Sequence, residues 1–305
     1  MSVLGYKAAA RAAQNHRDEC VNNTRPAVAI IAQGAMGAGA ARRLTDNGVR
    51  VLTSLAGRSP ASAERARAAG MIDATETEIA AADIILSIVP PGNALRLAQR
   101  LAPAIAAANK KPVYADCNAV SPDTVMQIAA VIAAADAPFA DAGIIGGPPR
   151  AGYAGPIFYY CGDDAGPLER LNDFGLVFRR VDGGIGAASA LKMSYGGITK
   201  GLTAVGSAML LAAARAGVAE ALHAELAASQ PNLLAYFQRS VPDMFGKAYR
   251  WVAEMDEIAR FTGGGPSREM YEAIADLYER LAADKRGDQA DISALAQFFE
   301  NSPKT

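Results

Sequence analysis

Lys192 is the side chain of this sequence that is best suited to acid–base chemistry. It is the only lysine between Lys111 and Lys200, and it lies in a run of small residues from Ile185 to Met193. Burial and neighbouring dipoles can bring the pKa of such a lysine toward neutral pH, where it can donate or accept a proton. The residues alone leave a second interpretation open, in which Lys192 is a solvent-exposed lysine on a helix surface.

In a helix, Tyr195, Gly196 and Thr199 would share one face with Lys192, at positions i+3, i+4 and i+7. The phenol of Tyr195 could orient the lysine or donate a proton itself. Gly196 leaves space for a substrate beside the lysine. We therefore predict Lys192 and Tyr195 as catalytic residues and Gly196 as a substrate-binding residue.

A short apolar run over residues 28–31 ends in a glycine turn, and a helix-compatible stretch follows. The turn contains Gly34, Ala35, Met36 and Gly37. Such a strand–turn–helix unit can hold the pyrophosphate of a dinucleotide, because glycine lets the backbone approach and the helix N-terminus offers free N–H groups. The spacing departs from the usual G-x-G-x-x-G, since Ala32 stands at the first glycine. An ordinary tight turn is the alternative.

The end of the second expected strand, over residues 50–56, bears on the choice between NAD and NADP. An acidic residue there would bind the ribose hydroxyls, but the chain continues with Gly57, Arg58 and Ser59. Arg58 offers charge-assisted hydrogen bonds to a 2′-phosphate, and Ser59 offers a hydroxyl donor. The sequence therefore favours NADP(H) over NAD(H), and a surface arginine at a helix start is the alternative.

Three further residues are assigned to the cofactor site at the ends of two later strands. Val89 and Pro90 end an apolar run, and Asn118 follows the strand expected over residues 113–116. Asn118 could hold either the substrate or the nicotinamide amide, so it is predicted for both sites. An Asx turn before Ser121 is the alternative for this side chain.

The order of the expected elements predicts two domains. Between residues 27 and 182, short apolar strands alternate with helices, which is typical of a doubly wound α/β sheet of the Rossmann type. Residues 183–305 show only helical patterns and begin with one helix of about 30 residues, long enough to join two domains. Trp251 in this all-α part could form a wall of a substrate cleft or pack in a helical core. Residues 1–26 are predicted as a solvated N-terminal extension.

Composition excludes several classes of partner. The chain has 305 residues, with 30 Lys and Arg against 31 Asp and Glu, so it lacks the positive charge of a nucleic-acid-binding protein. Three cysteines without C-x-x-C spacing and two histidines predict no metal site. The apolar stretch over residues 202–214 is broken by Thr203, Gly206 and Ser207, which indicates a buried helix and no membrane span. Without a secretory signal, we expect a cytoplasmic protein.

Four motifs, in this order along the chain, resemble those of the β-hydroxyacid dehydrogenase family, relatives of 6-phosphogluconate dehydrogenase. They are Gly34-Ala-Met-Gly37, Asp116-Cys-Asn-Ala-Val-Ser-Pro122, Asp141-Ala-Gly-Ile-Ile-Gly-Gly147 and Gly183-Gly-Ile-Gly-Ala-Ala-Ser-Ala-Leu-Lys192. The resemblance spans residues 27–300. It implies an NAD(P) cofactor, Lys192 as general acid and base, and a homodimer formed through the helical domain.

The resemblance also places Ile145, Gly146 and Gly147 in the substrate site, where the glycine N–H groups would face an anionic substrate. In the details the chain looks closest to a divergent, uncharacterised branch of 6-phosphogluconate-dehydrogenase-like oxidoreductases. Ile145 stands where the family has a serine, and Gly196 stands where it has an asparagine. The family's K-D-L motif is absent, and Glu254-Met255 lies roughly in its place.

These observations together predict an NADP(H)-dependent oxidoreductase that transfers hydride between nicotinamide and a carbonyl or hydroxyl carbon, with Lys192 as general acid or base. The family's best-known relatives imply a β-hydroxy acid or its semialdehyde as the small-molecule substrate. Two alternatives stay open. One is an imine reductase or reductive aminase, enzymes that resemble this fold but usually lack the lysine. The other is a non-catalytic NADP-binding sensor.

Overall fold

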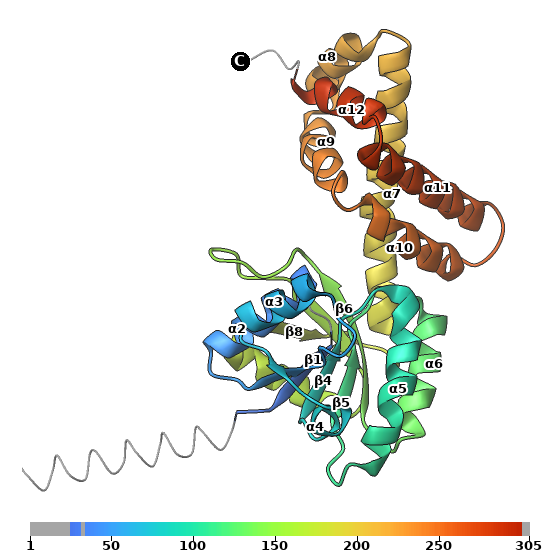
Figure 1. Cartoon of the computed structure of the whole chain (residues 1–305). Helices are drawn as coiled ribbons and strands as arrows, with labels where there is room; N and C mark the ends of the chain where they lie inside the picture. The colour runs from blue at the N-terminus through green and yellow to red at the C-terminus, as the bar shows by residue number, and fades with distance from the viewer. Residues whose placement is uncertain (1–24, 32–33, 301–305) are drawn as a thin grey trace, which may run out of the picture. The chain divides into compact units, whose positions relative to one another are not determined.

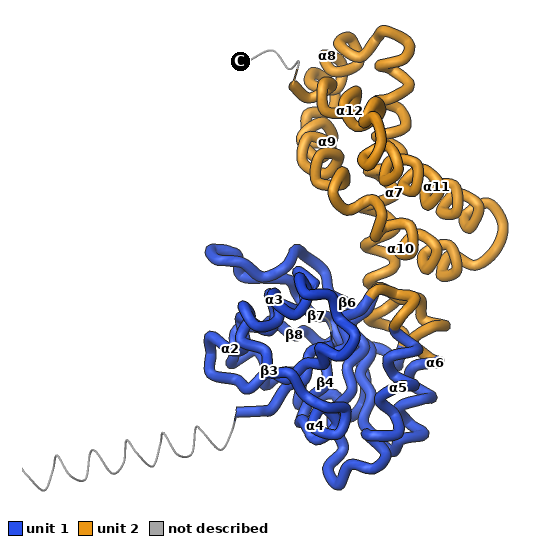
Figure 2. The backbone as a smooth tube through the Cα atoms, in the orientation of Figure 1, with its two compact units in different colours: residues 1–89, 94–118, 127–185 blue, residues 90–93, 119–126, 186–305 orange. Residues whose placement is uncertain are grey.

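The computed structural model describes residues 25–31 and 34–300, so most of the expected N-terminal extension lies outside the described residues. The chain forms two compact units (Figure 2). Unit 1 holds the residues up to Val89 together with Ala94–Asn118 and Gln127–Ile185. Unit 2 holds Pro90–Asn93, Ala119–Met126 and the chain from Gly186 onward. The sequence predicts one domain boundary, near residue 183. In the structure, unit 2 also contains the two short segments from earlier in the chain.

Unit 1 is built on one eight-stranded sheet in the order β3-β2-β1-β4-β5-β6-β7-β8. The strands are β1 (Val28–Ile31), β2 (Val51–Thr53), β3 (Ile72–Asp73), β4 (Ile84–Ser87), β5 (Val113–Asp116), β6 (Phe139–Ile145), β7 (Ile157–Cys161) and β8 (Val177–Arg180). All neighbouring strands run parallel except β6 and β7. The strand order reverses between β1 and β4, and this switch point is where doubly wound sheets bind ligands. The predicted Rossmann-type fold is therefore confirmed.

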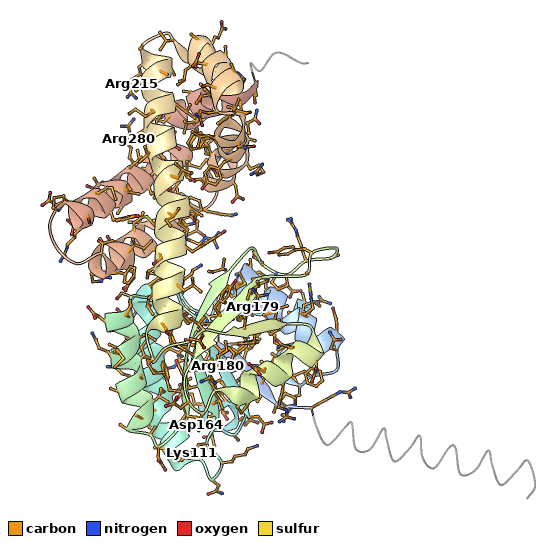
Figure 3. All side chains as sticks on the ribbon, turned by 180° about the vertical axis from the view of Figure 1, so that it is seen from behind. Lys111, Asp164, Arg179, Arg180, Arg215 and Arg280 are labelled. Atoms are coloured by element: carbon orange, nitrogen blue, oxygen red, sulfur yellow. The ribbon has the colours of Figure 1, made fainter. Side chains whose placement is uncertain are left out.

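Helices cover both faces of the sheet, which explains why its central strands are buried along their whole length and are mostly apolar. They are α2 (Ala35–Asp46), α3 (Pro60–Ala68), α4 (Glu76–Ala80), α5 (Ala94–Ala107), α6 (Pro122–Ala133) and the 3-10 helix η2 (Gly166–Phe174). The side chains of α2, α3 and η2 share one core with alternate residues of β1, β4 and β5. Helices α5 and α6 lie on the other face (Figure 1). Lys111 closes the end of α5 by donating to the carbonyls of Ile105 and Ala106 at 2.9 and 2.6 Å (Figure 3).

Unit 2 is helical throughout its described residues, as the sequence predicts. Besides the 3-10 turn η1 (Pro91–Asn93), it contains α7 (Ala187–Arg215), α8 (Ala219–Ser229), α9 (Pro231–Met244), α10 (Ala248–Phe261), α11 (Pro266–Arg286) and α12 (Ala290–Glu300). The later helices pack along α7, and Phe237 of α9 fills the space that Gly206 leaves open on it. The segment of residues 119–126 is tied in by Glu257 of α10, whose carboxylate accepts from the Ser121 N–H at 2.7 Å and the Thr124 hydroxyl at 3.1 Å.

Helix α7 is long and apolar enough to cross a membrane by length and composition alone. Half of its most apolar 18-residue window is buried inside the protein, as in the core helix of many globular proteins, so this is weak evidence for a membrane span. The buried residues include Met193, Ala204, Leu210 and Leu211.

Candidate active site

The glycine turn lies at the N-terminus of α2, next to the end of β1. Gly34 precedes the helix with an extended backbone, and a Cβ atom placed on it would meet no atom within 4 Å. Gly34 and Ala35 are exposed, Met36 packs against the core of unit 1, and Gly37 is buried. Ala32, the first residue of the expected motif, lies outside the described residues. A pyrophosphate can therefore approach the first turn of α2 at Gly34, which itself carries no side chain.

Arg58 and Ser59 lie beyond the end of β2, and both are exposed. Ser59 is the N-cap of α3, because its hydroxyl accepts from the Ser62 N–H at 3.3 Å. The Asp73 carboxylate, at the end of neighbouring β3, accepts from the Leu55 N–H at 2.9 Å. Arg58 is thus the exposed charge between β2 and α3, while Ser59 has a structural role that needs no ligand.

Asn118 ties together the ends of β4 and β5. Its side-chain oxygen accepts from the Val89 N–H at 2.6 Å, and its amide donates to the Ser87 hydroxyl at 2.9 Å and to the Asp116 carboxylate. These hydrogen bonds go to two strands and not to the following turn, so the side chain does not form the Asx turn. Both amide hydrogens are used, and a bound ligand could reach only the second lone pair of the oxygen.

Two buried carboxyl groups lie side by side at the ends of β5 and β6. Asp116 and Asp141 are register partners, and both side chains are fully buried. Burial raises the pKa of Asp116 to about 7, repulsion from Asp141 adds to this, and the hydrogen bond from Asn118 opposes it. The Oδ2 atom of Asp116 has no hydrogen-bond partner among the described residues. Asp116 and Asp141 both lie in motifs of the sequence, but the sequence did not predict that their carboxyl groups are buried.

The predicted substrate loop leaves the end of β6. Ile145 pairs with Ile157 in the sheet, and Gly146 and Gly147 are exposed. Gly146 has a φ of +122°, and a Cβ atom there would lie 2.8 Å from the Tyr153 hydroxyl. A side chain there would be strained and would crowd Tyr153, so this conformation requires glycine.

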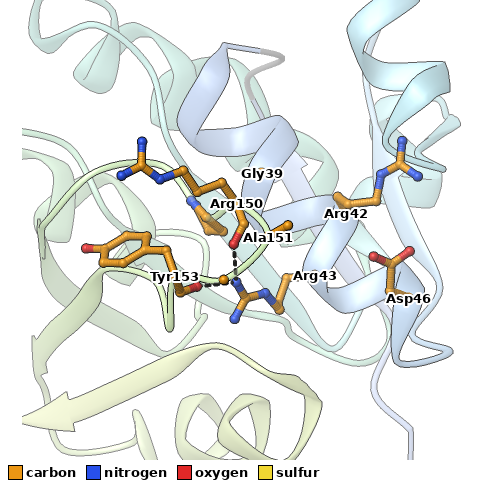
Figure 4. A pocket seen from close by; sticks show the side chains of 9 residues that line it. Gly39, Arg42, Arg43, Asp46, Arg150, Ala151 and Tyr153 are labelled. Carbon is orange, nitrogen blue, oxygen red and sulfur yellow. Dashed lines mark hydrogen bonds between the residues drawn. The ribbon is translucent and has the colours of Figure 1, made fainter.

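Arg43 of α2 braces this loop, a role that the sequence analysis did not predict. Its guanidinium donates to the Tyr153 carbonyl at 2.9 Å, with a longer contact to Arg150 (Figure 4). It also donates to the Ala154 carbonyl at 3.0 Å. Residues 149–153 of this loop, together with Arg42, Arg43 and Asp46 of α2, line a surface hollow of about 580 Å³. None of the predicted site residues lines it. Because Arg43 and the loop are more than a hundred residues apart, sequence spacing carries no signal for this contact.

Lys192 lies in the second turn of α7, in unit 2, and is half-buried. Burial, and after it the ammonium group of Lys200, lower the pKa of Lys192 to about 8, and the Glu254 carboxylate opposes this shift. The lysine can therefore both hold and release a proton near neutral pH. Tyr195, one turn further on, has a side chain that is 49% exposed.

Gly196 and Trp251 lie beside an ion pair that the sequence analysis did not predict, between Lys200 of α7 and Glu254 of α10. A Cβ atom on Gly196 would lie 3.8 Å from the Lys200 Nζ atom and 3.7 Å from Ile258. The Trp251 ring faces the same ammonium group at 5.5 Å and packs edge-on against Tyr278. The sequence offered one signal for this pair, a charged residue on the inward side of each of two helices. That the two residues pair with each other is visible only in the structure.

The predicted residues thus form two groups, one in each unit. Unit 1 carries the glycine turn, Arg58, Ser59, Val89, Asn118 and the loop of residues 145–147. Unit 2 carries Pro90, Lys192, Tyr195, Gly196 and Trp251. Among the described residues, no group of three or more His, Cys, Asp or Glu side chains is placed to hold a metal ion.

Comparisons with known proteins agree with this architecture. Residues 27–174 match the family model of the NAD binding domain of 6-phosphogluconate dehydrogenase, and residues 213–281 match a domain of unknown function (DUF1932). No curated protein matches the sequence significantly.

Solved structures match over most of the chain. One is a conserved protein of unknown function, MTH1747, described as structurally similar to 3-hydroxyacid dehydrogenases. It has 30% identity and a TM-score of 0.65, over 85% of this chain and 97% of that one. A conserved hypothetical protein from Sinorhizobium meliloti 1021 has 25% identity and a TM-score of 0.65, over 90% and 97%. A 3-hydroxyisobutyrate dehydrogenase from Salmonella typhimurium shares the fold, with 20% identity and a TM-score of 0.66, over 89% and 99%.

Proposed function

This chain belongs to the β-hydroxyacid dehydrogenase and 6-phosphogluconate-dehydrogenase-like family of NAD(P)-dependent oxidoreductases, and on that premise we propose that it interconverts a β-hydroxy acid and its carbonyl form with NADP(H). The observation that carries the proposal is Lys192, whose pKa of about 8 suits a group that exchanges a proton with substrate near neutral pH. The substrate is a small molecule, a β-hydroxy acid or its semialdehyde.

The residues of unit 1 fit a dinucleotide. The open space beside Gly34 and the exposed first turn of α2 suit a pyrophosphate, and Asn118 orders the end of β4 through the Val89 N–H. When bound, the cofactor supplies or accepts the hydride. The Gly146 and Gly147 N–H groups are suited to an anionic substrate group.

Lys192 supplies the proton chemistry in this proposal. In reduction, its ammonium form donates a proton to the carbonyl oxygen of the substrate. In oxidation, its neutral amine accepts the proton from the hydroxyl. With a pKa of about 8, roughly one molecule in ten carries the neutral amine at pH 7, so one residue can serve both directions. Tyr195 is the second candidate for orienting the lysine or the substrate.

Arg58 supports the choice of NADP(H). Its exposed guanidinium can form charge-assisted hydrogen bonds with a 2′-phosphate, and such bonds contribute about 1.5–3 kcal/mol. Arg58→Ala should therefore raise the KM for NADPH by roughly 10- to 100-fold and leave the KM for NADH unchanged. Arg65→Ala, an exposed arginine on helix α3, which follows Arg58, is the matched control. A wild-type preference for NADH would refute this part of the proposal.

A stripe of exposed apolar side chains supports a homodimer formed through α7. The stripe consists of Ile198, Leu202, Val205 and Met209, which are 69, 39, 54 and 59% exposed. Their alternating spacing of four and three residues is that of a helix–helix seam. Val205→Glu should yield monomers in size-exclusion chromatography with light scattering, whereas Met270→Glu, an exposed residue on α11, should not. A Val205→Glu protein that still dimerises would place the interface elsewhere.

We also propose that the protein works in the cytoplasm without a membrane or nucleic-acid partner, and that no metal takes part. The nearly equal numbers of acidic and basic residues support the absence of a nucleic-acid partner.

The activity test is absorbance at 340 nm on the purified chain, with NADPH and NADH and in both directions. The panel holds β-hydroxy acids, semialdehydes, and ketones with and without an added amine. We expect NADPH-dependent turnover of an acid or semialdehyde that falls at least 100-fold in Lys192→Met and stays in Lys247→Met, a surface lysine paired with Asp243. Turnover that needs the amine would indicate a reductive aminase. Tight cofactor binding without turnover of any compound would favour the sensor.

A further inference from the structure

A buried ion pair joins α7 and α10 two helical turns from Lys192. The Lys200 ammonium contacts the Glu254 carboxylate, and the two side chains are only 14 and 19% exposed. The backbone of Lys200 is held as well, because the Tyr278 hydroxyl donates to its carbonyl at 2.6 Å. A partly buried pair of this kind adds little net stability, since desolvation offsets much of the attraction between the charges. Stability alone therefore does not account for it.

The Lys200 side chain folds back along α7 toward Lys192. Side chains on a helix lean toward its N-terminus, and the Nζ atom of Lys200 lies 3.8 Å from where a Cβ atom of Gly196 would be. Gly196 is one turn after Lys192 and one turn before Lys200. Because Gly196 has no side chain, the Lys200 side chain can lie along α7 toward the turn that carries Lys192.

The charges around Lys192 in unit 2 come from both helices of the pair. Lys200 lowers the pKa of Lys192 and Glu254 raises it, each after the larger effect of burial. Burial tends to raise the pKa of Glu254, but Lys200 and then Lys192 outweigh it, with a smaller contribution from Arg250, so this carboxyl stays ionised. Helices α9 and α11 contribute the phenols of Tyr236, Tyr271 and Tyr278.

We propose that Lys200 and Glu254 are a positioning pair that sets the protonation state of Lys192, with Lys200 favouring the neutral amine and Glu254 favouring the ammonium ion. The proposal rests on the function proposed above, in which Lys192 moves the proton. The two members should act in opposite directions, which a merely structural pair would not do.

The test measures the titration of Lys192 directly, on the full chain without cofactor or substrate. Trace labelling with acetic anhydride between pH 6 and pH 10.5, followed by mass spectrometry of the peptide that contains Lys192, reports the fraction of neutral amine. The wild type should show a midpoint near pH 8. Lys200→Met should move the midpoint up by at least one pH unit, and Glu254→Gln should move it down by about one.

Controls separate charge from packing. Lys200→Arg keeps the cation and should keep the midpoint, and Lys247→Met removes a lysine from a surface pair and should have no effect. If the pair only held α7 and α10 together, the loss of either side chain would expose Lys192 to water. The midpoint would then rise in both Lys200→Met and Glu254→Gln, and that result would overturn the proposal. An unchanged midpoint in both variants would overturn it too.

If Glu254→Gln does not fold, the double variant K200M/E254Q replaces it. Its midpoint must lie below that of Lys200→Met alone, and an equal or higher midpoint would overturn the proposal. Because the labelling needs no turnover, its result is independent of whether the activity assay finds a substrate.

Discussion

The pH dependence of unfolding can be worked out from one buried group of unit 1, the carboxyl of Asp116. This side chain is fully buried at the end of β5, next to Asp141, and its pKa is raised to about 7 from an ordinary 3.8. The folded protein therefore keeps a proton on Asp116 at pH values where the unfolded chain has lost it. We expect wild-type stability to fall as the pH rises from about 4 to about 7, and to level off above that range.

The size of the effect follows from the two pKa values. The difference of about 3 pH units, at 1.36 kcal/mol each, corresponds to about 4 kcal/mol between the two ends of the range. Asp116→Asn removes this pH-dependent loss of stability. The side-chain carbonyl of the new asparagine can still accept the hydrogen bond from Asn118. Its amide group takes the place of the unpartnered Oδ2 atom and costs about 1–3 kcal/mol. The variant should therefore be more stable than the wild type by about 1–3 kcal/mol at pH 8, and within about 1 kcal/mol of it at pH 5, where the wild type has lost only about 1.6 kcal/mol.

The assay is urea unfolding of the cofactor-free protein at pH 5, 6, 7 and 8, followed by far-UV circular dichroism. Hydrogen exchange of peptides from β4 and β5 reports unit 1 separately. Asp173→Asn, an exposed carboxylate of the same unit, is the matched control and should leave the pH dependence unchanged. Wild-type stability that stays flat or rises between pH 5 and 8, or a stability difference between Asp116→Asn and the wild type that does not shift in favour of the variant over that range, would refute this account of Asp116.

Three further perturbations test the site and the packing. Gly206→Ala places a Cβ atom 2.4 Å from the Phe237 ring and should destabilise unit 2 by about 1–3 kcal/mol, measured by urea unfolding followed by tryptophan fluorescence. The rate of reduction should fall above about pH 8 as Lys192 loses its proton, and the rate of oxidation should rise through the same pH, so identical profiles in both directions would contradict its role. Arg43→Ala removes the bonds that hold residues 150–154 and should speed hydrogen exchange in that loop while α2 stays protected.

Local patterns predicted much of the fold, because helices and buried strands leave a periodic trace in the chain. The strand over residues 28–31, the glycine turn and the single long helix after Gly186 all follow from patterns within a few neighbouring residues. Strands β6, β7 and β8 were not anticipated. They include the antiparallel pair of β6 and β7, which alternating strand and helix patterns do not specify.

Motif residues were easier to find than their neighbours. Lys192 could be singled out because it is an isolated lysine in a small-residue run that resembles a family motif. The ion pair beside it could not, because Lys200 and Glu254 are 54 residues apart and no motif joins them. Asn118 was expected to bind cofactor or substrate, and the structure adds that its side chain first serves to join the ends of β4 and β5.

By itself the sequence determined the class of fold, the position of the glycine turn, the identity of Lys192 and the family resemblance, since each rests on residue types at short and regular spacing. The tertiary structure decided the protonation of Lys192 and Asp116, the position of the Lys200 ammonium beside Gly196, and the bracing of the loop by Arg43. The physical reason is that burial and charge act through space. A pKa depends on which groups surround the side chain, and only folding brings those groups together.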